Sequence, residues 1–202
     1  TELYNGTSWS AQANLPGTCE SNGGSGSSTS AMSTGGSGTL ANTNSIQFTG
    51  TCWNDGPSLT GSISSTGAQG DSATSAMVAG GQPGQAPPGQ KGCQQFNGTS
   101  WSNIAAELLE ARTRTSGIGG TNAGIIASGD APGGRLSTAE TWNGTSWSSL
   151  SNIAGSAVSN CGGSTKASST SHMLVGGSTT PSSFPGAAEI YSEPSIKTVT
   201  AT

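Results

Sequence analysis

Few residue types in this chain could carry catalytic or metal chemistry, and histidine sets the first limit. His172 is the only histidine among the 202 residues. A catalytic zinc or copper site needs about three protein ligands, so histidine alone cannot build one here. A lone histidine at a loop or strand edge is usually structural or solvated. We therefore expect no metal, no cofactor and no catalytic role for His172.

The ten acidic residues are dispersed, but one carboxylate position recurs. Glu2, Glu140 and Glu189 each stand two residues before an aromatic side chain. This recurrence indicates a structural hydrogen bond or salt bridge, with a residue such as Arg112 or Arg114 as the partner. No Asp-x-Asp-x-Asp-Gly calcium loop occurs. A glycosidase built on two carboxylates that meet in the fold is the enzymatic alternative, but our expectation is that the protein is not an enzyme.

Charge and composition limit the classes of partner. The formal net charge is -4, and the six basic residues are scattered, so no patch for nucleic acid is expected. No run approaches the 18 to 20 or so apolar residues that span a bilayer, and we expect no membrane insertion. The chain holds 33 glycines and only 30% hydrophobic residues. Such a composition predicts disorder unless the sequence is periodic.

The chain is periodic. An aromatic-Asn-Gly-Thr-Ser-Trp motif occurs four times with small variations, and an eroded fifth copy begins at Tyr191. The first aromatics are spaced by 44, 48, 46 and 49 residues, a period that suits four-stranded propeller blades. A short apolar run that ends in Gly-Gly or a variant of it keeps the same register at 31–36, 76–81, 125–130 and 172–177. The aromatic positions that we expect to be structural are Tyr4, Trp9, Phe48, Trp53, Phe96, Trp101, Trp142, Trp147 and Tyr191.

Each unit predicts four strands. Gly/Ser-rich segments near 17–27, 62–72, 113–121 and 156–165 are expected innermost, where blades converge and side chains must be small. The apolar run, the Glu-x-aromatic segment and the Thr-Ser-Trp-Ser segment follow as the second, third and fourth strands. Asn-Gly predicts a type I′ hairpin turn between the last two, with positive φ at both central residues. The aromatics that flank this turn can pair across the strands or pack between blades. The helix-like stretch at 104–112 is expected to be a loop or one short helix.

The cysteines and sequons have structural explanations. Cys19, Cys52, Cys93 and Cys161 contain no Cys-x-x-Cys and allow three complete pairings. We expect free thiols, with a disulfide as the alternative, and a small buried side chain at Cys52, where other copies have serine. The three Asn-Gly-Thr sequons are interpreted as turns, with glycosylation as the alternative.

These landmarks resemble the kelch repeat, a family of β-propellers. The order is Arg in Ala111-Arg112, an apolar run, Gly-Gly, Glu-x-aromatic, then Trp. Copper radical oxidases are built on such scaffolds, but they need clustered His and Tyr ligands, and both tyrosines here lie at repeat positions. More narrowly, the Asn-Gly-Thr-Ser-Trp motif resembles that of virion or tail-associated repeat proteins of tailed phages of aquatic bacteria, cyanophages in particular. That resemblance implies a virion or extracellular location.

The predicted fold is an all-β, kelch-like propeller in a single domain over 1–202. It has a half blade at 1–10 and blades at about 17–57, 62–105, 113–151 and 156–200. Because the chain begins within a repeat, we expect trimming or a longer polypeptide. Two arrangements are open for the half blade. It can join or replace the outer strands near 186–200 and close the ring, or it can pair with another subunit.

The expected function is that of a non-catalytic virion structural or adhesion module, in a tail fibre, an appendage or a capsid surface. Loops on one propeller face would contact a host-surface carbohydrate or another virion protein. The loops after the second strands supply the candidate contact residues, although their bland, Pro-rich content also suits a spacer. The alternative is a self-assembling fibre or oligomer, linked by strand exchange of the half blade and without a ligand. The candidate contacts are Gln85, Gln90, Lys91, Arg135, Ser182 and Phe184.

Overall fold

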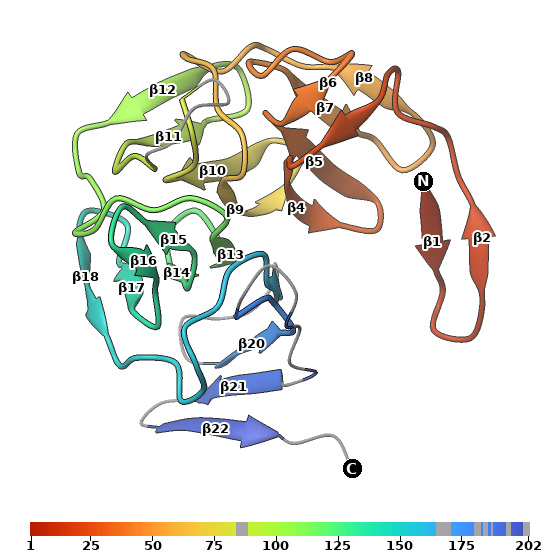
Figure 1. The fold of residues 1–202 in the computed structure, drawn as a ribbon. Coiled ribbons are helices and arrows are strands. Elements are labelled where there is room, and N and C mark those ends of the chain that lie inside the picture. The colour runs from red at the N-terminus through yellow and green to blue at the C-terminus, as the bar shows by residue number, and fades with distance from the viewer. Residues whose placement is uncertain are drawn as a thin grey trace.

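The computed structural model describes residues 1–83, 89–164, 171–179, 183, 186, 188–192 and 195–199. Four four-stranded antiparallel sheets lie around a common axis as the blades of a β-propeller (Figure 1), which confirms the predicted fold class. Neither the stretch at 104–112, which is a loop after Ile104, nor any other part of the described chain is helical. Accordingly, no helix long and apolar enough to cross a membrane occurs in that part.

Each blade runs from an innermost to an outermost strand in chain order. Blade 1 consists of β4 (Gly23–Ser27), β5 (Ser30–Thr34), β7 (Ser45–Phe48) and β8 (Trp53–Asp55). Blade 2 consists of β9 (Gly67–Ser72), β10 (Ser75–Ala79), β11 (Cys93–Phe96) and β12 (Trp101–Ile104). Blade 3 consists of β13 (Ser116–Gly119), β14 (Gly124–Ala127), β17 (Ala139–Trp142) and β18 (Trp147–Leu150). Blade 4 consists of β19 (Gly162–Gly163), β20 (Ser171–Val175), β21 (Ala188–Ser192) and β22 (Ser195–Val199).

Three two-stranded sheets complete the described structure. The end hairpin pairs β1 (Glu2–Tyr4) with β2 (Trp9–Ala11). In blade 1, β3 (Cys19–Glu20), before the first strand, pairs with β6 (Ser37–Gly38), after the second. In blade 3, β15 (Asp130–Ala131) pairs with β16 (Gly134–Arg135) after the second strand.

Glycine lets the innermost strands approach one another closely. A Cβ on Gly67 of β9 would lie 2.7 Å from Ile126 of blade 3, and a Cβ on Gly117 of β13 would collide with the backbone of Ala68. Backbone atoms cannot rotate away as a side chain can, so position 117 excludes any other residue without a shift of the strand. This confirms that the Gly/Ser-rich segments form the inner strands.

The hairpin between the third and fourth strands is present, but the predicted turn type is wrong. Gly98 has a φ of +96°, whereas Asn97 is not among the residues with positive φ. The Asn97 N–H donates to the carbonyl of Ser100 at 3.3 Å, and its side-chain Oδ1 accepts the N–H groups of Thr99 and Ser100. Asparagine is therefore used for its side-chain oxygen, which replaces a backbone acceptor within the loop.

The aromatic residues both pair across the strands and pack between blades, the two alternatives that the sequence left open. Phe96 and Trp101 face each other across β11 and β12 with ring centroids 5.3 Å apart. They also share a buried cluster with Met32 of blade 1. In the same way Trp142 and Trp147 of blade 3 pack with Met77 of blade 2. Each aromatic pair thus covers the second strand of the preceding blade, and this contact is the repeating interface of the propeller.

In blades 1 to 3, a glycine just after the second strand makes a hydrogen bond to the next blade. The N–H of Gly36 donates to the carbonyl of Ile63 at 2.9 Å, and the N–H of Gly81 donates to that of Arg112 at 2.8 Å. Gly129 repeats the bond toward Val158 at 2.8 Å. These glycines have φ values of +93° to +108°, a region that other residues rarely adopt. Substituting any of them would strain the link between blades.

The end hairpin does not join blade 4, which contradicts the first of the two arrangements expected for the half blade. Its strands pair only with each other, and β20 keeps β21 as its outer neighbour. The hairpin instead lies against blade 1, where the Trp53 indole N–H donates to the hydroxyl of Thr1 at 2.9 Å. In Figure 1 the hairpin and blade 4 lie at the two ends of an arc.

Candidate functional site at the propeller axis

Four residues at one repeat position form a ring around the axis, which we call the axial mouth. Ser21, Ser65, Arg114 and Asn160 each stand two residues before the innermost strand of their blade. All four have positive φ, between 52° and 58°. This conformation is uncommon outside glycine and costs free energy, so four symmetric cases indicate that the surrounding structure imposes it.

Backbone hydrogen bonds connect the axial mouth. The N–H of Ser65 donates to the carbonyl of Ser21 at 2.7 Å, and the N–H of Arg114 donates to the carbonyl of Ser65 at 2.7 Å. Asn160 continues the chain to Arg114 at 2.9 Å. In blades 2 to 4 the amide of this residue thus bonds to the preceding blade, and all four residues line the cavity at the mouth.

A polar cavity of about 240 Å³ lies at this mouth. At about 30 Å³ for each water in the liquid, it has room for roughly eight waters or a ligand of that size. The described residues that line it carry mostly hydroxyl and amide groups and no aromatic ring: Ser21, Asn22, Ser65, Thr66, Arg114, Thr115, Asn160 and Cys161. A second cavity of about 190 Å³ continues between the inner strands of all four blades.

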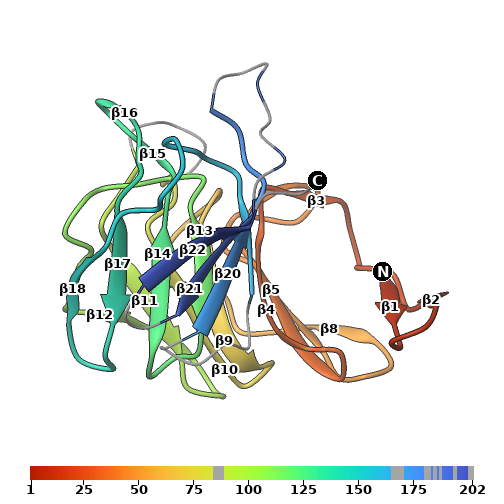
Figure 2. The same cartoon turned by 90° about the horizontal axis from the view of Figure 1, so that it is seen from below.

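The axial mouth opens on the face that carries the candidate contact loops. Because the first and second strands of a blade are antiparallel, the start of one and the end of the other lie on the same face. The β15–β16 hairpin, which follows the second strand of blade 3, projects from this face in Figure 2. The loops and the mouth therefore form one surface.

Ion pairs hold the rim of the mouth at blade 3. The Arg114 guanidinium donates to Asp130 at 2.9 Å, and Arg135 lies 3.5 Å from the other oxygen of that carboxylate. Two guanidinium groups around one carboxylate leave the rim with a local positive charge. Arg114 is half exposed, so its remaining N–H groups are available to a ligand.

Three of the predicted contact residues are described, and all of them bond within the chain. The Gln90 amide donates to the carbonyl of Gly80 at 3.4 Å, and the Lys91 ammonium donates to that of Leu109 at 2.7 Å. Arg135 donates to the hydroxyl of Ser159 at 3.2 Å. Only Arg135 also belongs to the ion pairs at the mouth. The other three, Gln85, Ser182 and Phe184, lie outside the described residues.

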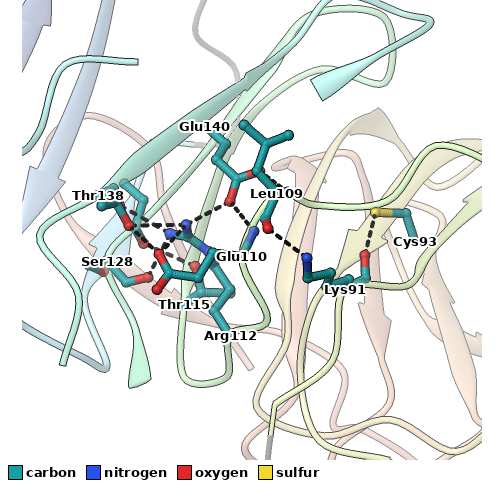
Figure 3. Close-up of polar contacts among 10 residues, drawn as sticks. Lys91, Cys93, Leu109, Glu110, Arg112, Thr115, Ser128, Thr138 and Glu140 are labelled. Atoms are coloured by element: carbon teal, nitrogen blue, oxygen red, sulfur yellow. Dashed lines mark hydrogen bonds and ion pairs between the residues drawn. The ribbon is translucent and has the colours of Figure 1, made fainter. Parts of the chain in front are cut away.

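The recurring carboxylate is structural at Glu140 and Glu189, as expected, whereas no described residue donates to Glu2. Arg112 is fully buried, and its guanidinium donates to Glu140 at 2.7 Å (Figure 3). It also donates to the carbonyls of Ser128 and Thr138 at 3.1 and 3.0 Å. Burial lowers the pKa of Arg112, and the adjacent Glu140 carboxylate offsets part of this effect. The charged pair is thus hydrogen-bonded on both sides inside blade 3.

The same carboxylate position fastens the segment that enters from the preceding blade. Glu140 accepts the N–H groups of Leu109 and Glu110 at 2.7 and 3.2 Å. In blade 4, Glu189 accepts those of Ala154 and Gly155 at 2.9 and 2.7 Å. Gln94 plays this part in blade 2, where its Oε1 accepts the N–H of Thr60 at 2.8 Å.

His172 and the four cysteines lie at separate positions in the propeller. His172 is buried in β20, where it lines a small apolar cavity between blades 3 and 4. All four cysteines are free. The expectation of a buried Cys52 is wrong, because this residue is exposed beside its turn, and hydrogen bonds led by that from Thr49 lower the pKa of its thiol. Within the described ranges, no three His, Cys, Asp or Glu side chains cluster as metal ligands would.

No family model and no curated protein sequence matches the chain. The interpretation of the axial mouth therefore depends on its own geometry. Sequence reasoning had missed it because the four ring residues differ in type. The available signal was positional: a polar residue recurs two places before each Gly/Ser-rich inner strand.

Proposed function

We propose that the protein is a non-catalytic adhesion module of a virus particle that holds a host-surface carbohydrate at the axial mouth. The observation that carries this proposal is the polar cavity of about 240 Å³ on the face that bears the variable loops. Hydroxyl, amide and guanidinium groups suit the many hydroxyls of a sugar. Ring-shaped scaffolds with binding loops on one face commonly recognise ligands in this way. The proposed virion location rests only on the resemblance of the repeat to virion or tail-associated proteins of phages.

The composition of the cavity also bears on affinity. Among the described residues no aromatic side chain lines it, so these residues would hold a sugar by hydrogen bonds without ring stacking. Each site is then expected to bind weakly, because these bonds replace equally good ones to water. Many copies on one particle would raise the avidity through effective concentration. The positive rim at Arg114 favours sugars that carry a carboxylate or sulfate.

A glycan array probed with the protein tests the proposal, with Arg114→Asn and Lys91→Gln as matched variants. Each removes one positive charge, and asparagine tolerates the positive φ at position 114. Binding lost in Arg114→Asn and kept in Lys91→Gln supports the axial site. The opposite result would move the contact to the loops. No binding to any glycan, or the absence of the protein from purified virions, would refute the adhesion role.

A second candidate function, that of a self-assembling structural protein, is favoured by the unpartnered ends of the arc. Tyr4 and Trp9 at one end, and Met173 and Val175 at the other, are exposed hydrophobic side chains.

A further inference from the structure

The end hairpin presents one half of the repeating blade interface without a partner. Tyr4 and Trp9 pair across the hairpin with ring centroids 5.2 Å apart, as the aromatic pairs of the blades do. Trp9 is nevertheless 68% exposed, whereas its equivalent Trp101 is 6% exposed. In blades 2 and 3 this aromatic surface packs on a second strand of the preceding blade, and within the described ranges no second strand lies against it here.

Glu2 of the hairpin is exposed and, within the described part of the chain, lacks the protein donors that its repeat position has in blades 3 and 4. It occupies the position at which Glu140 and Glu189 accept N–H groups from the preceding blade. Among the residues that the structure describes, Glu2 has no hydrogen-bond donor. Both the apolar and the polar element of the hairpin therefore lack the blade on which they would rest.

Blade 4 presents the complementary half. Met173 and Val175 of β20 are each 44% exposed, whereas the equivalent Met77 and Ala79 of blade 2 are fully buried under Trp142 and Trp147. Gly177 has the φ of the glycines that bond to the next blade, +100°, but within the described ranges its N–H makes no such bond.

Each end is fixed to its own neighbour, which leaves these surfaces facing outward. The hairpin is held on blade 1 by the bond from Trp53 to Thr1, and blade 4 is held on blade 3 by the bonds at Asn160 and Gly129. Within the described residues, no bond from Ser21 returns to Asn160 to close the ring. Closure within one chain would require these fixed ends to move, whereas a second copy can meet them as they stand.

We propose that the chain associates head to tail, with Tyr4 and Trp9 of one copy packed on Met173 and Val175 of a second copy. The contact repeats the interface that the chain already makes twice between its own blades. An interface of this heterologous kind produces rings or filaments, because every copy keeps one free end of each type. The inference rests on the second candidate function and does not involve the axial mouth.

Light scattering across a concentration series tests this, with Trp9→Ser and Met173→Ser as the interface variants. Both side chains are exposed, so neither change should unfold the chain. Leu109→Ser is the matched control, since Leu109 is 50% exposed and lies on neither surface. We expect the wild type and the control to exceed the single-chain mass of 19.7 kDa as the concentration rises. Each interface variant should associate about thirtyfold more weakly, as loss of a central apolar anchor does.

Mixing the two interface variants gives the decisive result. Trp9→Ser retains the blade 4 surface and Met173→Ser retains the hairpin, so the mixture should form a dimer that neither variant forms alone. A wild type that is monomeric at every concentration would overturn the proposal and indicate closure within one chain. A mixture of the two variants that stays monomeric would also overturn the proposal. Glycan binding measured on the Trp9→Ser monomer keeps the two functions apart.

Discussion

The buried Arg112–Glu140 pair permits a quantitative test of what holds blade 3 to its incoming segment. Glu140 accepts three donors, from Arg112, Leu109 and Glu110, at 2.7, 2.7 and 3.2 Å. Glu140→Gln removes the negative charge and places the glutamine NH₂, a donor, against one of these three donors. Breaking a buried pair in this way costs about 3–5 kcal/mol, since the remaining charge is left uncompensated. We expect the same range for Arg112→Met.

The double variant should be less damaging than the sum of the two. With both charges gone, it leaves one backbone donor and the Ser128 carbonyl without partners, at about 1–3 kcal/mol each. The expected loss is therefore about 2–6 kcal/mol, against about 6–10 for the summed single changes. The difference between the summed single losses and the loss in the double variant is the coupling free energy of the two charges.

Urea unfolding followed by tryptophan fluorescence measures these losses. With a slope of about 1–3 kcal/mol per molar urea, each single change should lower the midpoint by roughly 2 M. Asp130→Asn is the control, because the Arg114 side chain in its ion pair is 47% exposed and such pairs contribute at most about 1 kcal/mol. Strict additivity in the double variant would refute the reasoning, as would a control that costs as much as Glu140→Gln.

Two further predictions follow from the inner strands and the buried thiol. Gly117→Ala should lower the free energy of unfolding by about 1–3 kcal/mol in urea titrations, because its Cβ meets the backbone of Ala68. Gly24→Ala is the control: its Cβ has open space, and the free energy of unfolding should change by less than about 0.5 kcal/mol. Equal effects of the two substitutions would count against close packing at the axis. Burial raises the pKa of Cys93 to about 12, so the unfolded chain loses this proton first as pH rises. Stability should then fall by about 1.4 kcal/mol per pH unit above about pH 9, relative to a Cys93→Ala variant, and parallel profiles for the two proteins would contradict the buried thiol.

The repeat made the blades predictable because each copy contains its own strand signals. The spacing of Trp9, Trp53, Trp101 and Trp147 sets one hairpin per unit, and the Gly-Gly after each apolar run sets the second-strand ends. The turn at Asn97-Gly98 shows the limit of this reasoning. Asparagine and glycine are common to several hairpin turns, and only the backbone angles show that Asn97 contributes a side-chain acceptor.

The candidate site was less predictable, because its members are joined only by the ring. Ser21, Ser65, Arg114 and Asn160 share a position but no chemical type, so no motif marks them. Their common feature is a backbone conformation that the inter-blade hydrogen bonds impose. Of the loop residues chosen from sequence, Arg135 alone among those described takes part in the ion pairs at the mouth.

By itself, the sequence determined the all-β blades, the inner position of the glycine-rich strands and the structural use of the aromatics, since period and side-chain size act locally. The tertiary structure alone decided how the ends meet. The end hairpin carries the same motif as a blade, and its sequence suits pairing with blade 4 as well as packing on blade 1. Only packing in three dimensions shows that it lies on blade 1, which leaves Trp9 and Met173 exposed at opposite ends of the arc.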